Sequence, residues 1–407
     1  MALIVQKYGG SSAADVEKIK GIARRVIACK ERGDQVVVVI SAMGDTTDEL
    51  LALARGVTSQ PDERELDVLL STGEVVSSAL LAMALQSTGH GAVSLNGGQA
   101  GIQTDNSYSR ARIRAVVPQR ILKELDKGNI VVVAGFQGIT EEMDVVTLGR
   151  GGSDTTAVAL AVSLGAEACH IYTDVEGVFT ADPRIVPEAR RLEEIDYDEM
   201  LELATYGAKV MHSRAVEIGK IYDMPILVAC SFADRPGTVI HGGTAMELHN
   251  KVRGIAHDLN VAKVTVLGVP DKPGIASAIF EPLADAGVSV DTIVQNTSVD
   301  GITDLTFTVA SNDLDKAAGI VEPISRSIGA KGYQSAAELG KVSIVGTGMQ
   351  NAPGYAARMF TALYNAGINI ELITTSEIRI TCIVNEEKLS DAVRALHKAF
   401  RLEEADS

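Results

Sequence analysis

Short apolar runs alternate with amphipathic stretches over the first ~240 residues of the chain. Val36–Ile40 and Ile130–Ala134 contain no polar side chain, as expected of strands that are covered on both faces. Helical spacing of apolar positions is found between them, at residues 62–88 and 109–127. This alternation predicts an α/β domain of three layers, in which a mostly parallel sheet has helices on both sides.

A change in composition marks the end of this domain, and a repeat follows it. Residues 236–250 contain Pro-Gly-Thr and then His-Gly-Gly-Thr, which is typical of a boundary between domains. Beyond them, residues 273–288 match residues 353–368 at an offset of 353 − 273 = 80 positions. Each copy predicts a strand, a Pro-Gly turn, a helix and a further strand, and the turn leaves first-turn N–H groups open to a small anionic ligand. A duplicated packing unit that only forms a dimer contact is the alternative.

Composition limits the function classes that remain. With 407 residues the chain is long enough for two or more domains, and its 46% apolar and 22% charged residues are ordinary for a globular protein. Only 4% of the residues are aromatic and none is Trp, which disfavours a stacking platform for single-stranded nucleic acid. The formal charge of −16 also disfavours nucleic acid and anionic membranes as partners.

Cysteine and histidine patterns predict no metal site. The cysteines show no C-x-x-C spacing and lie in apolar surroundings, so buried free thiols are favoured over disulfides or metal ligands; they are Cys29, Cys169, Cys230 and Cys382. The histidines form no H-x-x-x-H or H-E-x-x-H pattern. No signal peptide is recognised, and no apolar run is read as approaching the ~20 residues that span a bilayer, so we expect a cytoplasmic protein.

The strongest candidate for chemistry is the glycine-rich run 149–156, Gly-Arg-Gly-Gly-Ser-Asp-Thr-Thr. It predicts a strand-to-helix turn in which Ser153 or Asp154 caps the helix and the glycines let an anion approach the backbone. It matches neither G-x-x-x-x-G-K-[ST] nor G-x-G-x-x-G. Glycine-rich turns of this kind also occur with a purely structural role.

Two further segments have the residue types of an anion site. Lys7-Tyr8-Gly9-Gly10-Ser11-Ser12 follows an apolar strand and precedes a helical segment. The segment 173–184 places two aspartates and an arginine after the apolar stretch 169–172, which suits a nucleotide with its magnesium ion. A surface lysine before a tight turn and a solvated acidic loop are the alternatives. Ligands of open α/β sheets gather at the carboxyl ends of the strands, and each of these segments follows a predicted strand.

In this order and spacing, KYGGSS, GRGGSDTTA and TDVEGVFTADPR resemble the aspartate kinases of the amino-acid kinase family over nearly the whole chain. The repeat resembles tandem ACT domains, which are βαββαβ modules that bind amino acids. The resemblance implies a catalytic domain at 1–245 and two ACT-like modules at 260–335 and 336–407, whose segments interleave along the chain.

The activity that this resemblance implies is transfer of a phosphoryl group from ATP to the side-chain carboxylate of L-aspartate, giving 4-phospho-L-aspartate. This is the committed step toward lysine, threonine and methionine, and it is controlled by lysine, threonine or both through the ACT modules. The acceptor carboxylate is already ionised at pH 7, so the chemistry needs positive charge and positioning rather than a general base. ATP is the cosubstrate and carries Mg²⁺ with it.

The resemblance also implies roles for particular residues. Lys7 contacts the transferred phosphate, and Asp154 organises the site around it. Nucleotide contacts are expected from Lys7, Tyr8, Gly9, Gly10, Ser41, Thr173, Asp174, Phe179, Thr180, Asp182, Arg184 and Lys209. Aspartate contacts are expected from Thr47, Glu74, Arg150, Gly151, Gly152 and Ser153. Arg150 would bind a carboxylate of aspartate and Glu74 its ammonium group, although Glu74 taken alone reads as a solvated helix residue.

Effector contacts follow from the same resemblance. The first pocket is expected at Asp271, Gly274, Ile275, Ala276, Gln295 and Asn296, and the second at Asn351, Tyr355 and Ala356. The second copy differs because Asn351 replaces Asp271. An aspartate can form an ion pair with a ligand ammonium group, whereas an asparagine can only hydrogen-bond to it. Family members pair through their ACT modules as homo-oligomers, and some make a separate regulatory subunit from an internal start such as Met246 would provide.

Three other functions compete with this interpretation. A kinase of the same fold for another small acid, such as N-acetylglutamate, is weakened by Glu74, which needs a free ammonium partner, and by the repeat. A catalytically silent amino-acid sensor would not need Lys7, Arg150 and Asp154 together. A nicotinamide dehydrogenase lacks its G-x-G-x-x-G motif here.

Overall fold

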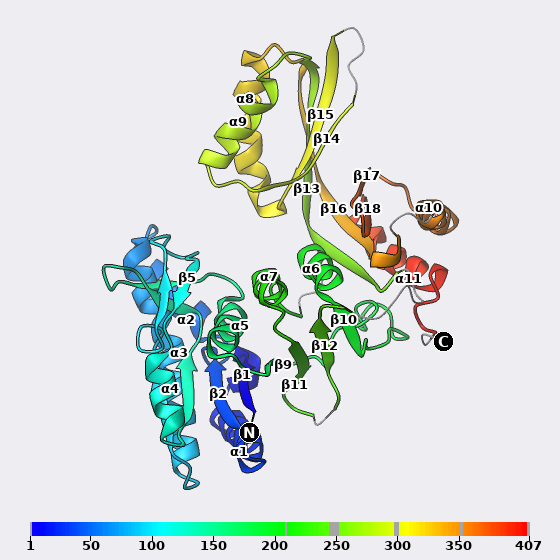
Figure 1. Ribbon diagram of the computed structural model, residues 1–407. Coiled ribbons are helices and arrows are strands. Elements are labelled where there is room, and N and C mark those ends of the chain that lie inside the picture. The colour runs from blue at the N-terminus through cyan, green and yellow to red at the C-terminus, as the bar shows by residue number, and fades with distance from the viewer. Residues whose placement is uncertain are drawn as a thin grey trace. The chain divides into compact units, whose positions relative to one another are not determined.

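The computed structural model describes residues 2–207, 210–233, 235–243, 252–296, 301–349 and 353–404. The chain forms two compact units, which are described separately below. The first contains the described residues of 1–179 and 191–247, and the second contains 180–190 and the described part of 248–407 (Figure 1). Lys209, Asn351 and Met246, which the sequence singles out, lie outside the described residues.

An eight-stranded sheet forms the centre of the first unit, in the order β10-β12-β11-β9-β1-β2-β6-β3. Neighbouring strands are parallel except for β11 and β12. The strands are β1 (Leu3–Tyr8), β2 (Gln35–Ile40), β3 (Ala92–Leu95), β6 (Ile130–Ala134), β9 (Ala168–Thr173), β10 (Glu194–Asp196), β11 (Ile226–Cys230) and β12 (Thr238–His241).

Helices cover both faces of this sheet. The α-helices are α1 (Val16–Glu31), α2 (Thr46–Val57), α3 (Glu63–Gln86), α4 (Gln119–Asp126), α5 (Gly152–Leu164), α6 (Tyr197–Tyr206) and α7 (Ser213–Tyr222), and η1 (Gly10–Ala13) is a short 3₁₀ helix. One core joins α1 and α3 to Val36, Val38 and Ile40 of β2. The helix α5 packs against β1, β2 and β9, and Val39 faces its first turn at Ser153, so α5 lies on the opposite face. The predicted three-layer α/β fold is confirmed.

The helix that the pattern predicts at 109–127 is wrong in its first half. Residues Ile113–Val116 form β5, and only Gln119–Asp126 are helical, with Pro118 at the helix start. A proline fixes φ and has no N–H to donate, so the segment divides there. The strand β5 belongs to a second, four-stranded sheet in the order β5-β4-β7-β8, with β4 (Ile102–Thr104), β7 (Gln137–Ile139) and β8 (Val145–Thr147).

The helix α3 is longer and more apolar than the sequence pattern indicates. Its 24 residues meet the length and composition of a membrane span, contrary to the expectation that no such run exists. Half of its most apolar window is buried inside the protein, however. Its inner face carries the buried acids Asp67 and Glu74, both of which accept hydrogen bonds from neighbouring segments. These contacts are those of a core helix.

The second unit is built on a six-stranded antiparallel sheet in the order β14-β15-β13-β16-β18-β17. Its strands are β13 (Gly254–Pro270), β14 (Val290–Gln295), β15 (Ile302–Val309), β16 (Gly332–Val345), β17 (Leu372–Thr375) and β18 (Arg379–Asn385). Its helices are α8 (Ile275–Asp285), α9 (Leu314–Ser327), α10 (Tyr355–Asn365) and α11 (Leu389–Ala399), with the short 3₁₀ turns η2 (Ser311–Asp313), η3 (Thr347–Met349) and η4 (Glu386–Lys388).

The sequence repeat appears as two similar halves of this sheet. The helices α8 and α10 begin and end 80 residues apart, as the repeat predicts. The helices α8 and α9 pack together over one core, and α10 and α11 over another (Figure 1). The first residues of β13, 254–258, pair with the end of β16 and pack in the second core, which also buries Ala181 and Val186. The halves are therefore not consecutive blocks of sequence.

The four cysteines are buried free thiols, as predicted.

Candidate active site

The carboxyl ends of three central strands bring the predicted nucleotide segments to one edge of the sheet. In the parallel register, Tyr8 at the end of β1 is paired with Ile40 of β2 on one side and with Tyr172 of β9 on the other. Gly9, Ser41 and Thr173 follow at the same level. This is the arrangement that a parallel sheet imposes on residues that lie far apart in sequence.

Lys7 and Asp154 form an ion pair at this edge. Lys7 Nζ lies 2.7 Å from Asp154 Oδ1, and the two side chains are only 12% and 10% exposed. Asp154 is in the first turn of α5, where the helix dipole favours a negative charge. Its second oxygen, Oδ2, accepts a hydrogen bond from the backbone N–H of His212 at 3.3 Å. Asp154 is thus fixed from two sides and can hold the lysine amine in place.

Glycines leave space around this pair. A Cβ atom at Gly9 would lie 3.4 Å from Lys7 Nζ, and one at Gly10 would lie 3.1 Å from the carbonyl oxygen of Ala42. At Gly151, where φ is +67°, a Cβ atom would lie 2.3 Å from the His212 side chain. A larger residue at Gly9 would fill the region next to the lysine, where a phosphate group has to approach, whereas Gly10 and Gly151 allow neighbouring segments to pack closely.

The start of α5 differs in one respect from the expectation. The residue that caps the helix is Gly151, with no side-chain cap bond, rather than Ser153 or Asp154. The φ of +67° at this position explains the difference, because it is a conformation that glycine adopts without strain. Asp154 is consequently free to pair with Lys7. Arg150, just before the helix, is exposed.

Glu74 is a buried acid and not a solvated one. Its side chain is on α3, and the residue is 3% exposed. Glu74 Oε1 accepts a hydrogen bond from the N–H of Ala42 at 3.2 Å, whereas Oε2 has no hydrogen-bond partner among the described residues. Burial raises the pKa of this carboxyl to about 7. A buried carboxylate with an unused oxygen is suited to receive an ammonium group.

The loop after β2 packs between the segment that contains Lys7 and the helix α3, which contains Glu74. The N–H of Ser41 donates to the carbonyl of Tyr8 at 3.0 Å, and the N–H of Gly44 donates to the carbonyl of Gly10 at 3.1 Å. Thr47 follows in the first turn of α2 and is partly buried. This loop therefore connects the segment that contains Lys7 with the middle of α3, where Glu74 lies.

The remaining nucleotide residues have varied surroundings. The Tyr8 ring is buried and stacks on Tyr172 with centroids 4.9 Å apart, so its side chain belongs to the core. The Thr173 hydroxyl donates to Asp174, which is exposed. Phe179 belongs to the first unit.

Three predicted nucleotide residues pack with the second unit. They are Thr180, Asp182 and Arg184. The Thr180 hydroxyl lies 3.0 Å from Nε2 of the buried His397, and Arg184 pairs with Asp182. Their contact with a nucleotide stays a prediction.

The expected effector residues surround two similar turns of the second unit. Gly274 and Gly354 cap α8 and α10 with φ values of +91° and +107°, a conformation that favours glycine. Ile275 and Ala276 follow in α8, and the N–H of Asp271 donates to the carbonyl of Gly301 at 2.9 Å.

Residues around these turns are partly held by the protein itself. The carbonyl of Asn296, next to Gln295, accepts a hydrogen bond from Thr303. Tyr355, followed by Ala356 in α10, stacks on Phe400 with centroids 6.3 Å apart. Asn351 is outside the described residues, so the difference between Asn351 and Asp271 stays a prediction.

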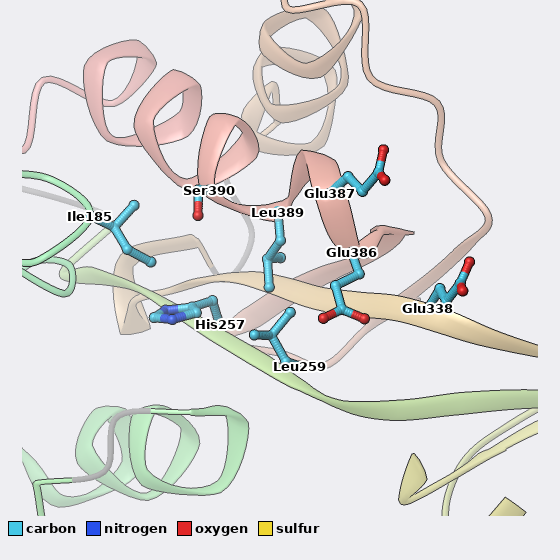
Figure 2. Close-up of a pocket in the computed structure, with 8 residues that line it drawn as sticks. All are labelled: Ile185, His257, Leu259, Glu338, Glu386, Glu387, Leu389 and Ser390. Carbon is cyan, nitrogen blue, oxygen red and sulfur yellow. The ribbon is translucent and has the colours of Figure 1, made fainter.

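A separate cavity of about 470 Å³ lies elsewhere in the second unit (Figure 2). None of the expected effector residues that the structure describes lines it. Figure 2 shows its mixed lining of three acidic, three apolar and two other polar side chains, which are Ile185, His257, Leu259, Glu338, Glu386, Glu387, Leu389 and Ser390.

Sequence reasoning missed three residues that hold the site together. The His212 backbone contacts Asp154, and burial keeps the pKa of its ring below the ordinary value. The Arg214 guanidinium donates to the carbonyls of Leu148 at 2.7 Å and Ala111 at 2.9 Å. Asp67 accepts four hydrogen bonds while fully buried. Asp67 lies seven residues before Glu74, so helical spacing could have placed it on the same face.

Comparison with family models gives the class of the protein. A model of the amino acid kinase family matches residues 2–230, and two ACT domain models match residues 263–325 and 342–400. With the lysine–aspartate pair at the sheet edge, these matches define an amino acid kinase that carries ACT domains.

Individual relatives specify the class further. The aspartokinase of Mycolicibacterium smegmatis is 50% identical, and the match covers 99% of this chain and 97% of that protein. The structure of E. coli aspartokinase III with aspartate and ADP (R-state) has a TM-score of 0.83 at 25% identity, covering 98% of this chain and 99% of that one. The structure of the same enzyme with lysine and aspartate (T-state) has a TM-score of 0.77, with the same identity and coverage. The chain therefore belongs to the aspartokinases, the aspartate kinases of the amino acid kinase family.

Proposed function

We propose that this aspartate kinase transfers the γ-phosphoryl group of ATP to the side-chain carboxylate of L-aspartate, and that lysine, threonine or both inhibit it through the ACT modules. The observation that carries the catalytic part is the pairing of charges at the sheet edge. Lys7 is already neutralised by Asp154 at 2.7 Å, whereas Glu74 is buried and its Oε2 has no hydrogen-bond partner within the described ranges. An amino-acid substrate brings an ammonium group to this oxygen of Glu74, and its ionised side-chain carboxylate accepts the phosphoryl group.

The reaction needs no proton transfer from the acceptor. The side-chain carboxylate of aspartate is ionised at neutral pH and attacks the γ-phosphorus, and the bond to the β,γ-bridging oxygen breaks as ADP leaves. Lys7 balances negative charge on the transferred group, and Asp154 keeps its amine directed there. Gly9 and Gly10 leave room for the phosphates, and the Mg²⁺ that accompanies ATP neutralises part of their charge.

Aspartate is recognised through its two other charged groups. Arg150 binds the α-carboxylate with its planar guanidinium, and Glu74 accepts the ammonium group. The expected contacts of Thr47 and of residues 151–153 complete this pocket. The R-state complex of E. coli aspartokinase III with aspartate and ADP supports aspartate as the substrate, since the match to that enzyme covers 98% of this chain with a TM-score of 0.83.

N-acetylglutamate is the alternative substrate of the same chemical class. Its acylated nitrogen carries no charge, so it would leave the buried Glu74 carboxylate without a cation. That cost disfavours it relative to aspartate.

Control by an amino acid is proposed for the turns at Gly274 and Gly354. The T-state complex of the E. coli enzyme with lysine and aspartate supports a lysine-type effector. We further propose that the protein is cytoplasmic, that it forms a homo-oligomer through its ACT modules, and that an internal start at Met246 could give a separate regulatory subunit.

A coupled assay of ADP release tests these proposals. It compares L-aspartate, N-acetyl-L-glutamate and no acceptor, each with lysine, threonine, both or neither. We expect turnover with aspartate only, suppressed by at least one effector condition. Turnover without suppression would refute the regulatory part alone, and absence of aspartate-dependent turnover from folded protein would refute the catalytic part.

A further inference from the structure

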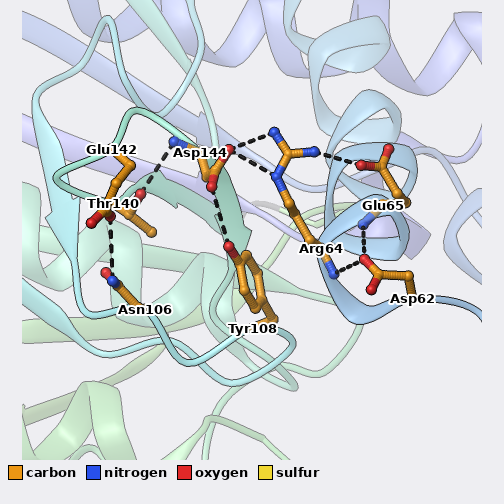
Figure 3. A network of polar contacts seen from close by, with 8 residues as sticks. All are labelled: Asp62, Arg64, Glu65, Asn106, Tyr108, Thr140, Glu142 and Asp144. Atoms are coloured by element: carbon orange, nitrogen blue, oxygen red, sulfur yellow. Dashed lines mark hydrogen bonds and ion pairs between the residues drawn. The ribbon is translucent and has the colours of Figure 1, made fainter.

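The first turns of α3 hold the short strand β8 at both of its ends. At the start of β8, Arg64 Nε donates to Asp144 Oδ1 at 2.9 Å, and the Tyr108 hydroxyl donates to Asp144 Oδ2 at 3.2 Å (Figure 3). Arg64 is 46% exposed, so this contact is open to solvent and contributes little. The other end of β8 is held one helical turn further along α3, by Asp67.

Asp67 is buried completely and its carboxylate is saturated with hydrogen bonds. Its oxygens accept from the N–H of Thr147 at 2.9 Å and from the Thr147 hydroxyl at 2.7 Å. They also accept from the N–H of Ser109 at 2.8 Å and from the Ser109 hydroxyl at 3.3 Å. All four donors are neutral and come from only two residues. Such a buried network permits very little variation in the positions of its members.

The two residues that Asp67 holds lead directly to the expected substrate loop. Thr147 is the last residue of β8, and Arg150 follows three positions later. At Gly149 a Cβ atom would lie 3.0 Å from the carbonyl oxygen of Ser109, so the loop that contains Ser109 packs closely on the backbone next to Arg150. Asp67 therefore determines where the chain enters the glycine-rich turn.

Asp67 and Glu74 occupy the same buried face of one helix. They are seven residues apart, or about 10 Å along the helix axis. The helix α3 thus presents Glu74 at one point and fixes the path to Arg150 at another. Glu74 and Arg150 are the expected partners of the ammonium group and the α-carboxylate of aspartate. The distance between Glu74 and Arg150 therefore has to match the distance between these two groups in one substrate molecule.

We propose that Asp67 is a positioning residue that sets the distance between Glu74 and the Arg150 turn, and so determines how aspartate fits. This inference rests on the proposed function. It assigns Asp67 no contact with the substrate. The nucleotide side, which is organised by Lys7 and Asp154, is held by separate contacts and should not depend on it.

The test is a kinetic comparison of Asp67→Asn with wild type. An asparagine keeps the shape but places an NH₂ group against N–H and hydroxyl donors, which forces the loop to shift. A shift of about 1 Å in an element that positions the substrate lowers catalytic efficiency by about tenfold to a hundredfold. We expect an increase of that size in the KM for aspartate, with the KM for ATP within about twofold of wild type. Calorimetric titration with aspartate should show the same loss of affinity.

Two matched controls separate positioning from a general loss of stability. Glu124→Gln neutralises another buried carboxylate of the same unit, on α4, where it accepts from Lys127 and Asn129. Arg64→Gln removes the exposed contact at the other end of β8. Both should leave the KM for aspartate unchanged. Equal increases in both KM values for Asp67→Asn, or wild-type kinetics in a merely less stable variant, would overturn the proposal.

A milder variant keeps the test decisive if Asp67→Asn does not fold. Thr147→Val removes one of the four hydrogen bonds with little change in shape and should raise only the KM for aspartate, by a few-fold. Unchanged KM values in folded Thr147→Val would then overturn the proposal. Wild-type enzyme that shows no turnover with aspartate would refute the proposed function itself, which is a different outcome.

Discussion

Replacing Glu74 by glutamine should make the protein more stable at neutral and alkaline pH while impairing its use of aspartate. Burial raises the pKa of Glu74 to about 7 from its ordinary value of 4.5, a difference of 7 − 4.5 = 2.5. Because the folded state holds this proton more tightly than the unfolded state, the stability falls as pH rises from about 4.5 to about 7. Above that range, ionised Glu74 costs the fold about 3 kcal/mol.

Glutamine does not ionise, so Glu74→Gln should lack this pH dependence. The linkage relation gives a cost of about 1 kcal/mol at pH 5.5 and about 3 kcal/mol at pH 8 for wild type. We therefore expect the free energy of unfolding of the variant, relative to that of wild type, to be about 2 kcal/mol higher at pH 8 than at pH 5.5. Urea unfolding of both proteins at both pH values, analysed with a common slope, measures this difference.

The substitution should impair binding of aspartate even though it stabilises the fold. Only the ionised carboxylate attracts the substrate ammonium group, so the wild-type KM for aspartate should fall as pH rises through about 7. Loss of this charged hydrogen bond should raise the KM for aspartate in Glu74→Gln by about tenfold to a hundredfold and remove that pH dependence. The KM for ATP should stay near its wild-type value.

The control for stability is Glu124→Gln. The side chains of Lys127 and Asn129 hold the pKa of Glu124 below its ordinary value, so this group stays ionised from pH 5.5 to 8. Its substitution should shift stability equally at both pH values. If Glu74→Gln also changed the free energy of unfolding equally at both pH values, the carboxyl of Glu74 would not titrate near neutrality and the reasoning would be refuted.

Three further predictions concern other parts of the protein. Lys7→Ala should lower turnover about a hundredfold or more without unfolding the protein, because it removes the charge beside the transferred group; near-normal kcat would exclude that role. Gly151→Ala should lower both thermal stability and aspartate turnover, since its Cβ would lie 2.3 Å from His212 and φ is +67°; wild-type values in melting and activity assays would contradict this. Asp271→Ala should relieve inhibition by the effector amino acid with little change in the uninhibited rate, and unchanged inhibition curves would place the effector elsewhere.

Much of the fold could be predicted because the central elements have strong patterns. The predicted strand Val36–Ile40 corresponds to β2, which starts one residue earlier, and the predicted helix 62–88 corresponds to α3 at 63–86. The offset of the repeat places α10 correctly to the residue once α8 is known. Apolar runs, helical spacing and self-similarity are all encoded locally, so they can be read without knowledge of distant contacts.

The errors arise where distant partners decide the structure. Ile113–Val116 is a strand because β4 pairs with it, although its own pattern fits a helix. Residues 180–190 pack in the second unit because Ala181 and Val186 complete its core, although they directly follow a loop of the first. Neither partner can be identified from the segment alone.

The candidate site is predictable only in part for the same reason. Local glycine-rich motifs single out Lys7 and Asp154 separately, but only the family resemblance assigns them to one site, since no local pattern joins residues that are 154 − 7 = 147 positions apart. Arg214 escapes prediction because it holds only backbone carbonyls, and helical spacing places Asp67 on the face of Glu74 without indicating that it holds the backbone of Ser109 and Thr147. Backbone carbonyls and N–H groups are present at every position, so a sequence carries no mark of which ones need an anchor.

The arrangement of charges explains why one site can be both stable and ready to bind. Lys7 already has a partner in Asp154, so the free enzyme does not hold an isolated cation at the sheet edge. Glu74 has no such partner in the described part of the chain, and the fold tolerates it because its raised pKa lets it take up a proton when the site is empty. A substrate ammonium group replaces that proton and stabilises the ionised carboxylate. Binding of aspartate therefore relieves the free-energy penalty of burying Glu74, which the fold already carries. A glutamine would remove the cost and, with it, the selectivity.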